Sequence, residues 1–536
     1  KYFGRASIFS NINTLNYKKD LGKHGLDVLL GTSMRDWRFE YMNGSRTGLI
    51  TDDPEKVNLA LATDDLSAQV YGGVIENALV SSFGRIIYDY DDKYILTAVV
   101  RRDGSTKFGP DNRFGVFPSF SGGWIISKER FFPQGGVISF LKLRASWGQN
   151  GNDQISDYAW VAAITSGRNY TMRDSSGAET LVVGSSPAQV ADPALSWEAS
   201  EQIDFGFDLT LWQDRLTINA DYFRKETKGL LIRKPVPAVA GNMAGETNVG
   251  GVLNRGLELS VNYRNTFGKL FTLIGGNITY IKNEVLTVDG ASGVITGAGI
   301  STYGTVTRME AGQPIGYYYG YKTDGIFQNE SEVFSHINAE GDPLQPRAVP
   351  GDVRFVDVNE DGIIDDDDRT FIGSPHPTLI YGFNGDLEYK NWRFLFLFFG
   401  NYGNEVFNGT RRHDLTEANF PKYWDDRWQG EGTSNTMPRY TFTDVNQNYS
   451  RISDLYVEDG SFLRLRNVTL GYTLKPNKHI KSAYIYVAAE NLLTFTKYRG
   501  LEPEIGARNG WILDMGIDRG VYPQAKTYRI GIDVKF

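Results

Sequence analysis

Hydrophobic and polar residues alternate with a period of two along most of this chain. One alternating segment covers 82–90 and another covers 93–101, with the polar turn Asp91-Asp92 between them. Further pairs of segments surround the short turns at Gln213-Asp214, Asn265 to Gly268, Tyr389 to Asn391 and Lys475 to Lys481. A period of two places alternate side chains on opposite faces of a strand, and a short polar turn between two such segments predicts a β-hairpin. The sequence therefore predicts an all-β protein built from antiparallel hairpins.

The same pattern predicts about fifteen long strands. We expect them near 2–17, 24–39, 79–91, 93–105, 113–127, 138–150, 199–212, 215–227, 250–265, 269–282, 378–390, 391–402, 460–474, 481–492 and 525–536. Two shorter strand-like pieces lie near 157–171 and 313–323. If both belong to long loops, all the short turns fall at one end of the sheet and all the long loops at the other. We therefore predict that neither piece belongs to the main sheet.

Three features favour a membrane barrel over a soluble β-sandwich or propeller, which composition alone leaves open. The strands span about 10–14 residues, which exceeds the usual five or six and suits a tilted strand that crosses a bilayer. Short turns alternate with long loops, as periplasmic turns alternate with extracellular loops in outer-membrane barrels. Aromatic residues gather near strand ends, as in interfacial girdles, at Tyr88, Tyr90, Tyr94, Tyr389 and Trp392. We predict a transmembrane antiparallel β-barrel whose last strand ends at Phe536.

Composition narrows the function. The 536 residues include no Cys and only five His, which excludes thiol catalysis, disulfide scaffolds and Cys-ligated metal sites. The net charge is −8 and no block of basic residues occurs along the sequence, which argues against nucleic-acid binding. The longest apolar runs, such as 394–399, are far shorter than a transmembrane helix requires. No apolar signal core opens the sequence, which enters a strand-like pattern at once, so we expect it to begin within a fold.

Several short sequence motifs resemble the SusC/RagA family of TonB-dependent outer-membrane transporters of the Bacteroidetes. Each motif alone is weak, but the ordered set spans nearly the whole chain. The motifs are Arg101-Arg102-Asp103-Gly104-Ser105, Phe108-Gly109, Phe117-Pro118-Ser119, Glu129-Arg130-Phe131, Leu141 to Gly148, Trp197-Glu198, Asp221-Tyr222-Phe223, Gly256 to Leu259, Asp357 to Asp365, Asp368-Arg369-Thr370, Ile372-Gly373, Glu502-Pro503-Glu504, Tyr522-Pro523 and the terminal Phe536.

The resemblance implies a 22-stranded barrel with an N-terminal plug, preceded by a TonB box and a carboxypeptidase-like extension. Fifteen strands counted back from the last would be strands 8 to 22, so residues 1–536 would be a partial barrel. An odd number of strands also cannot form a complete bacterial single-chain barrel. We expect the plug, the TonB box, the signal peptide and the first seven strands to lie outside this sequence.

The resemblance also implies a function. The protein would reside in the bacterial outer membrane, in contact with its lipid, and import an oligosaccharide or oligopeptide. A SusD-like surface lipoprotein would act as its lid, and the TonB complex would supply the energy. An outer-membrane adhesin or receptor that displays its loops without transport is an alternative. A secreted β-rich binding protein is a third, which would need no outward aromatic girdle.

One loop has the spacing of a calcium site. Oxygen-bearing side chains occupy positions 1, 3, 5, 9 and 12 of an EF-hand-like loop, with a glycine at position 6 and a backbone carbonyl offered at position 7. The predicted ligands are Asp357, Asn359, Asp361, Ile363, Asp365 and Asp368. Asp368 departs from the usual Glu, and no clear helix flanks the loop. The alternative is an acidic extracellular loop that is rich in Asx turns and holds no ion.

Aromatic residues in other predicted outer loops are candidates for contact with a ligand or a partner. They are Tyr423, Trp424 and Trp428, followed by Tyr303 and Trp511. Packing within the loop is the alternative for each of them.

No residues are arranged for catalysis. The run Arg411-Arg412-His413-Asp414 has no nucleophile beside it. Glu502 and Glu504 flank Pro503 in a context that we expect to be exposed, which argues against a glycosidase pair. We expect neither enzymatic activity nor an organic cofactor.

Overall fold

The computed structural model describes residues 2–53, 55–173, 175–187, 189–233, 245–289, 292–300, 304–411, 422–475 and 480–536. The chain divides into two compact units. The first comprises Lys1–Glu129, Arg144–Ile203 and Glu226–Val249, and the second comprises Arg130–Leu143, Asp204–Lys225 and Gly250–Phe536.

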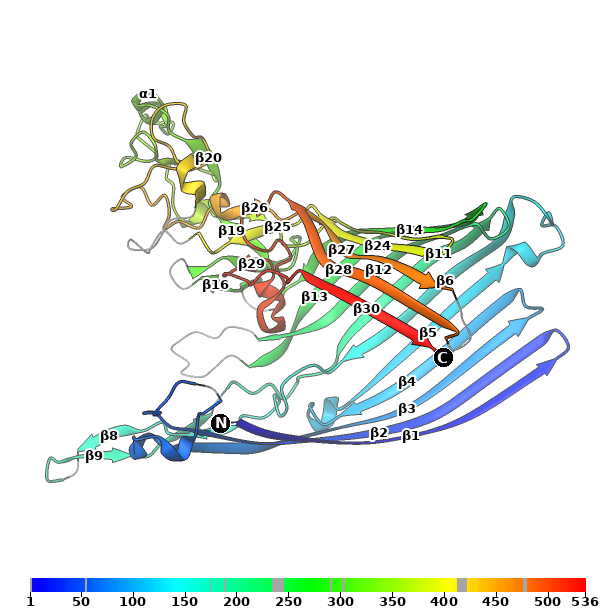
Figure 1. Cartoon of the computed structure of the whole chain (residues 1–536). Helices are drawn as coiled ribbons and strands as arrows, with labels where there is room; N and C mark the ends of the chain where they lie inside the picture. Colours follow the sequence, from blue (N-terminus) through cyan, green and yellow to red (C-terminus); the bar gives the residue numbers. More distant parts are fainter. Residues whose placement is uncertain are drawn as a thin grey trace. The chain divides into compact units, whose positions relative to one another are not determined.

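Fifteen long strands form one sheet, and each pairs with the next long strand along the chain (Figure 1). They are β1 (Tyr2–Leu21), β2 (His24–Ser45), β3 (Gln69–Tyr90), β4 (Tyr94–Ser105), β5 (Phe114–Ile125), β6 (Ile138–Asn152), β11 (Glu198–Leu211), β12 (Leu216–Arg233), β13 (Glu246–Phe267), β14 (Leu270–Thr287), β23 (Leu379–Tyr389), β24 (Trp392–Tyr402), β27 (Phe462–Leu474), β28 (Ser482–Thr496) and β30 (Thr527–Lys535). The predicted number of strands is confirmed.

The remaining strands of the described residues are short and lie in the long connections. They are β7 (Ile164–Ser166), β8 (Tyr170–Arg173), β9 (Glu179–Val182), β10 (Ser185–Pro187), β15 (Val294–Thr296), β16 (Gly299–Ile300), β17 (Gly304–Thr305), β18 (Thr307–Glu310), β19 (Tyr317–Gly320), β20 (Thr323–Ile326), β21 (Val353–Phe355), β22 (Thr370–Gly373), β25 (Glu405–Asn408), β26 (Val457–Asp459) and β29 (Ile517–Asp518). One short α-helix, α1 (Glu330–Ser335), accompanies them. Since β7, β8 and β19 pair outside the main sheet, the pieces near 157–171 and 313–323 belong to loops, as predicted.

Strand β3 begins ten residues earlier than the prediction near 79. Two adjacent glycines, Gly72 and Gly73, interrupt the alternating pattern in this region. Pairing with β2 nevertheless continues through them, with Gly72 opposite Met42 and Gly73 opposite Tyr41. A glycine retains the backbone N–H and C=O groups that a ladder needs, so pairing can outlast the side-chain pattern.

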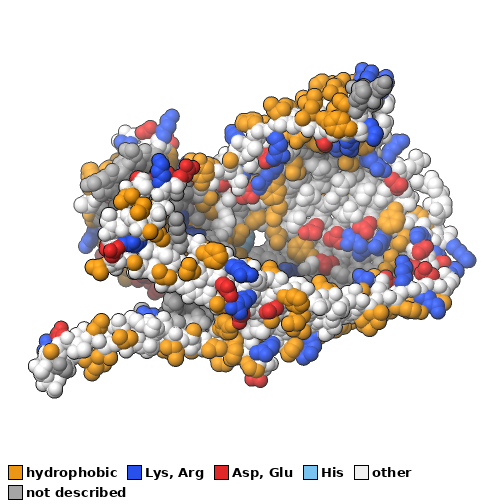
Figure 2. Space-filling model, turned by 60° about the horizontal axis from the view of Figure 1, so that its bottom comes forward, with side chains coloured by type: hydrophobic (Ala, Val, Ile, Leu, Met, Phe, Trp, Pro, Cys, Tyr) orange, Lys and Arg blue, Asp and Glu red, His pale blue; other side chains and the backbone are white. Residues whose placement is uncertain are grey.

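The two faces of strands β1 to β5 differ in chemistry. On one face, large apolar side chains remain exposed, including Leu15 at 69%, Leu30 at 54% and Leu96 at 58%. The opposite face carries ion pairs such as Arg85 with Asp27 at 3.5 Å. Figure 2 shows exposed hydrophobic side chains interrupted by separate clusters of acidic and basic residues. An apolar face of this extent suits contact with lipid. Among the described helices, none is long and apolar enough to span a membrane.

In the first unit, the residues of the motif around 101–109 make contacts at the end of the sheet where the long loops begin. The Ser105 hydroxyl donates to the Asp153 carboxylate at 2.8 Å. Phe108 is fully buried, and its ring centre lies 5.1 Å from that of Trp197. The Trp197 indole N–H donates to the backbone oxygen of Arg113 at 3.1 Å. These contacts attach the loop after β6 to the connection between β4 and β5.

Candidate functional site

Three long loops of the second unit, at 288–378, 403–461 and 497–526, pack into one body, which we call the loop module. Its central cluster draws buried apolar residues from all three loops. They are Ala298, Ile300, Val306, Tyr318, Ile372, Phe407, Ile452, Tyr456 and Ile517. The fully buried Tyr318 donates its hydroxyl to the backbone oxygens of Glu405 at 3.0 Å and Gly516 at 2.9 Å. One side chain thereby joins three loops, and its burial raises its pKa.

Backbone pairing reinforces the module. Strand β25 of the second loop pairs antiparallel with β26 and parallel with β29 of the third loop. A second apolar cluster forms around β20 and β21 and contains Tyr321, Ile326, Val353, Phe355 and Ile364. The Tyr321 hydroxyl donates to the Asp366 carboxylate at 2.9 Å, and burial raises the pKa of Tyr321 to about 12.

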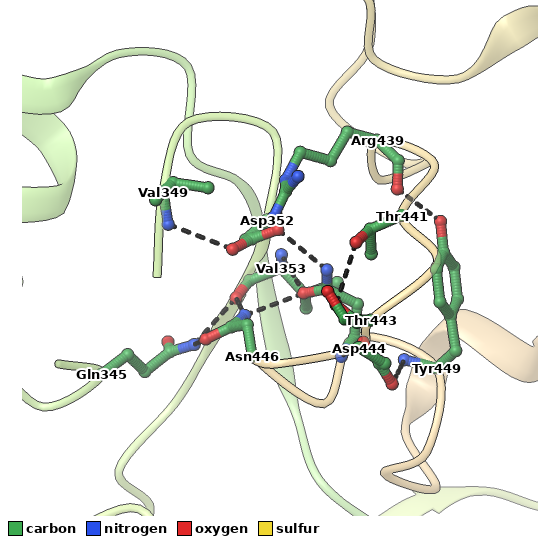
Figure 3. Close-up of polar contacts among 11 residues, drawn as sticks. Gln345, Val349, Asp352, Val353, Arg439, Thr441, Thr443, Asp444, Asn446 and Tyr449 are labelled. Atoms are coloured by element: carbon green, nitrogen blue, oxygen red, sulfur yellow. Dashed lines mark hydrogen bonds and ion pairs between the residues drawn. The ribbon is translucent and has the colours of Figure 1, made fainter. Parts of the chain in front are cut away.

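A buried polar network links the first loop to the second, as Figure 3 shows. Its centre is Asp352, which has no exposed surface. One carboxylate oxygen accepts from the backbone N–H of Val349 at 3.0 Å. The other accepts from the Arg439 guanidinium at 2.7 Å and from the Asn448 amide at 2.9 Å. A buried carboxylate needs such partners, because desolvation without them is costly.

The amide side chains around Asp352 complete the network. Gln345 donates to the Val353 oxygen at 2.9 Å and to the Asn446 side-chain oxygen at 3.0 Å, and it accepts from the Phe355 N–H at 2.8 Å. Asn448 accepts from the Val353 N–H at 2.9 Å and from the Asn446 amide at 2.8 Å. These side chains supply the backbone of β21 with partners that a neighbouring strand would otherwise provide.

The predicted ligand-contact residues differ in burial and in the residues they pack against. Trp424 is only 5% exposed and packs against Met437 and Tyr449. Trp428 packs against the β20–β21 cluster, and Trp511 packs against the central cluster. These positions favour the alternative, packing within the loops. Tyr303, like Arg412, His413 and Asp414, lies outside the described residues.

Tyr423 lines a cavity of about 600 Å³ in the loop module. Guanidinium carbons of Arg411 and Arg499 lie 5.4 and 5.3 Å from the centre of its ring. Glu458 pairs with Arg499 at 3.1 Å and with Arg411 at 3.9 Å. Burial raises the pKa of the Tyr423 hydroxyl, which stays neutral. Ligand contact at Tyr423 stays a prediction.

The predicted calcium loop is closed by hydrogen bonds to its own backbone. Asp368 is buried and accepts from the N–H groups of Val358 at 2.7 Å and Asp365 at 2.8 Å. Asp357 accepts from Gly362 N–H at 2.8 Å with one oxygen, and its other oxygen is buried without a hydrogen-bond partner among the described residues.

The other predicted ligands face their own loop as well. Asn359 accepts from Asp361 N–H at 3.1 Å, and Asp361 accepts from the N–H of Ile363 at 3.0 Å. In the described part of the chain, no group of three or more acidic or imidazole side chains is placed to hold a metal ion. The loop is therefore an Asx-turn structure in this geometry, and calcium binding stays a prediction.

The expectation that Glu502 is exposed is wrong. Glu502 is only 3% exposed and forms an ion pair with Arg464, which is itself buried. Glu504 pairs with Arg464 at 3.2 Å and with Arg466 at 2.6 Å. The two arginines lie nearly forty residues earlier, on β27, so no local pattern reveals them. The arrangement holds the third loop to the sheet.

The family model that matches this chain is described as "TonB dependent receptor-like, beta-barrel", and it covers residues 1–329. The chain belongs to this TonB-dependent receptor barrel family. Within it, the chain is similar to SusC and to RagA. TonB-dependent receptor P3 of Formosa agariphila is 32% identical over 98% of this chain and 52% of the relative. TonB-dependent receptor SusC of Bacteroides thetaiotaomicron is 28% identical over 97% of this chain and 49% of the relative.

Solved structures show the same fold. The RagAB peptide importer in its closed-closed state superposes with a TM-score of 0.79 at 24% identity, covering all of this chain and 56% of that one. The open-open state of RagAB gives 0.77. The chain spans about half the length of the curated relatives it matches. The predicted fold class and outer-membrane location are confirmed, and the relatives are receptors and transporters, not enzymes.

Proposed function

We propose that this chain forms the larger part of the barrel of an outer-membrane nutrient importer. A SusD-like lipoprotein would cover its loops, and TonB would supply the energy through the parts of the protein that precede this barrel segment. The observation that carries the proposal is the similarity to SusC along 97% of the chain. The shared fold with RagAB, which is described as a peptide importer, supports it.

The loop module provides a rigid surface for such a lid. All three loops share one apolar core, and a buried polar network joins the first loop to the second, so the loops move as one body instead of as separate flexible segments. A rigid surface loses little conformational entropy when a partner binds to it. We therefore propose the loop module as the part of this chain that meets the lid.

Between the two substrate classes we favour an oligopeptide. The cavity at Tyr423 is lined by Lys422 and Arg499 and also by Asp425 and Asp426, so it presents both signs of charge. A peptide carries both signs, whereas a neutral oligosaccharide gains most from open aromatic faces. Trp424 and Trp428 pack inside the loop module instead of offering such faces.

Native mass spectrometry of the full-length protein, extracted from its own outer membrane in mild detergent, tests this proposal. We expect a complex with a lipoprotein of roughly the size of this chain and a ladder of peptide masses released on activation. Oligosaccharide masses would refute the peptide preference alone. A protein recovered without a partner or ligand would favour the adhesin or simple receptor.

A further inference from the structure

A shallow groove lies on the apolar face of strands β1 to β4, in the first unit. Strand registers place most of its lining residues in two rows across neighbouring strands. The row farther from the long loops contains Leu15, Leu30, Gly84 and Val100, and the nearer row contains Asn13, Thr32, Ser82 and Arg102. The groove has a volume of about 590 Å³.

Small residues create the groove. Gly84 has no side chain and lies opposite Leu30 and Val100, which are 54% and 48% exposed. Ser82, in the adjacent row, is likewise small. The apolar side chains therefore form raised walls around a low floor. Such an apolar depression on a lipid-facing surface suits an acyl chain.

Arg102 is a cation at the end of the groove nearer the long loops, where polar side chains replace the exposed apolar ones. Its guanidinium carbon lies 3.9 Å from the centre of the Phe114 ring, and Phe114 is itself 50% exposed. Among the described residues, no carboxylate forms an ion pair with Arg102. A charge on the lipid-facing surface of a barrel destabilises it unless it reaches the interface or an anion. An anionic group of the membrane can supply the partner that the described carboxylates do not.

The depth of Arg102 identifies the leaflet. A row of aromatic side chains that includes Tyr94 and Trp124, stacked at 6.3 Å, marks the end with short turns. Arg102 lies eight residues farther along β4, which is ~27 Å along a strand and ~20 Å along the normal after a tilt of about 40°. Since the apolar band of such barrels is ~25 Å tall, Arg102 lies near its outer boundary.

We propose that this groove binds one lipid A molecule of the outer leaflet, with an acyl chain along Gly84 and a glucosamine phosphate on Arg102. Lipid A is the glycolipid of that leaflet, and it carries phosphate directly above saturated acyl chains. A guanidinium binds phosphate through two parallel hydrogen bonds, which an ammonium cannot reproduce. The polar side chains of Asn13, Thr32 and Ser82 continue from Arg102 along the same row and suit the sugar amides.

Two variants separate the phosphate from the groove. Arg102→Gln removes the cation, and Gly84→Val fills the floor. A Cβ at Gly84 would come no closer than 3.4 Å, to the Leu30 side chain, so the backbone can remain in place. Arg38→Gln is the control, since Arg38 is already paired with Glu76 at 2.8 Å. Heat-modifiable migration in gels confirms that each variant is folded.

Delipidated full-length protein, titrated with bisphosphorylated lipid A and followed by native mass spectrometry, gives the test. We expect one bound lipid A, with about tenfold weaker binding in Arg102→Gln and with dephosphorylated lipid A. Gly84→Val should also weaken binding, and Arg38→Gln should not. Equal binding by Arg102→Gln, or equal retention of phosphatidylglycerol, would overturn the proposal.

Discussion

Replacing Asn448 with alanine should separate two loops of the loop module while leaving the main sheet intact. Asn448 is 1% exposed. Its side-chain oxygen accepts from Val353 N–H at 2.9 Å and from the Asn446 amide at 2.8 Å, and its amide donates to Asp352 at 2.9 Å. The substitution removes all three hydrogen bonds at the junction of the first and second loops.

The structure sets the size of the effect. Val353 N–H would remain buried without an acceptor, which costs about 1–3 kcal/mol, and Asp352 would lose one charge-assisted bond worth about 1.5–3 kcal/mol. Asp352 keeps Arg439 and Val349 as partners, so its charge stays compensated. Relaxation recovers part of the sum, and we expect about 3 kcal/mol. That corresponds to a roughly hundredfold rise in the local opening equilibrium.

Hydrogen exchange of the full-length protein, read by mass spectrometry, measures this opening directly. Peptides covering 345–356 and 439–451 should exchange about a hundredfold faster in Asn448→Ala. Peptides from β24 should be unchanged. The control is Thr443→Ala, an exposed neighbour whose side chain takes no part in the network. Unchanged exchange over 345–356 would refute the claim that this network joins the loops.

Three further predictions concern other parts of the loop module. Arg464→Met leaves Glu502 buried without its cation and should destabilise the attachment of 497–526 by about 3–5 kcal/mol, measured by hydrogen exchange of that segment. Glu504→Gln changes the more exposed partner of Arg464 and should cost much less. Burial holds the pKa of His376 below its ordinary 6.5, so the neutral form of this side chain stabilises the fold fully above pH 6.5 and progressively less below it. Hydrogen exchange over 374–378 should therefore rise from pH 7.5 to 5.5 after correction for intrinsic rates. His376→Gln should abolish this rise. If the loop 357–368 binds calcium, about millimolar Ca²⁺ should slow hydrogen exchange in that loop, and Asp357→Asn should remove the effect. Identical exchange rates with and without Ca²⁺ would refute calcium binding.

Alternation in the sequence was sufficient to predict the sheet. Each long strand has one lipid-facing and one polar face, so a period of two persists along its length. The assignment of 157–171 and 313–323 to loops followed from the asymmetry between short turns and long connections, and the separate pairing of β8 and β19 confirms it. The start of β3 could not be read this way, because backbone pairing crosses Gly72 and Gly73 where side chains give no signal.

The loop module was largely beyond sequence reasoning. Its decisive contacts join residues about a hundred positions apart, such as Gln345 with Asn446, and neither residue stands out locally. Burial likewise depends on residues that are distant in the sequence: Trp424 packs against Met437 and Tyr449 farther along its own loop, and Glu502 pairs with Arg464 on β27. The motif at 357–368 correctly marks a tight acidic loop, but spacing alone cannot show whether its oxygens face an ion or the backbone.

Uptake in living cells tests the central claim most directly. Cells that carry the full-length protein would be supplied with a labelled oligopeptide mixture, with and without a protonophore, beside cells lacking the gene. An importer energised through TonB predicts accumulation that requires both the gene and the proton gradient. Surface binding that requires the gene, persists in the protonophore and never leads to accumulation inside would contradict the account.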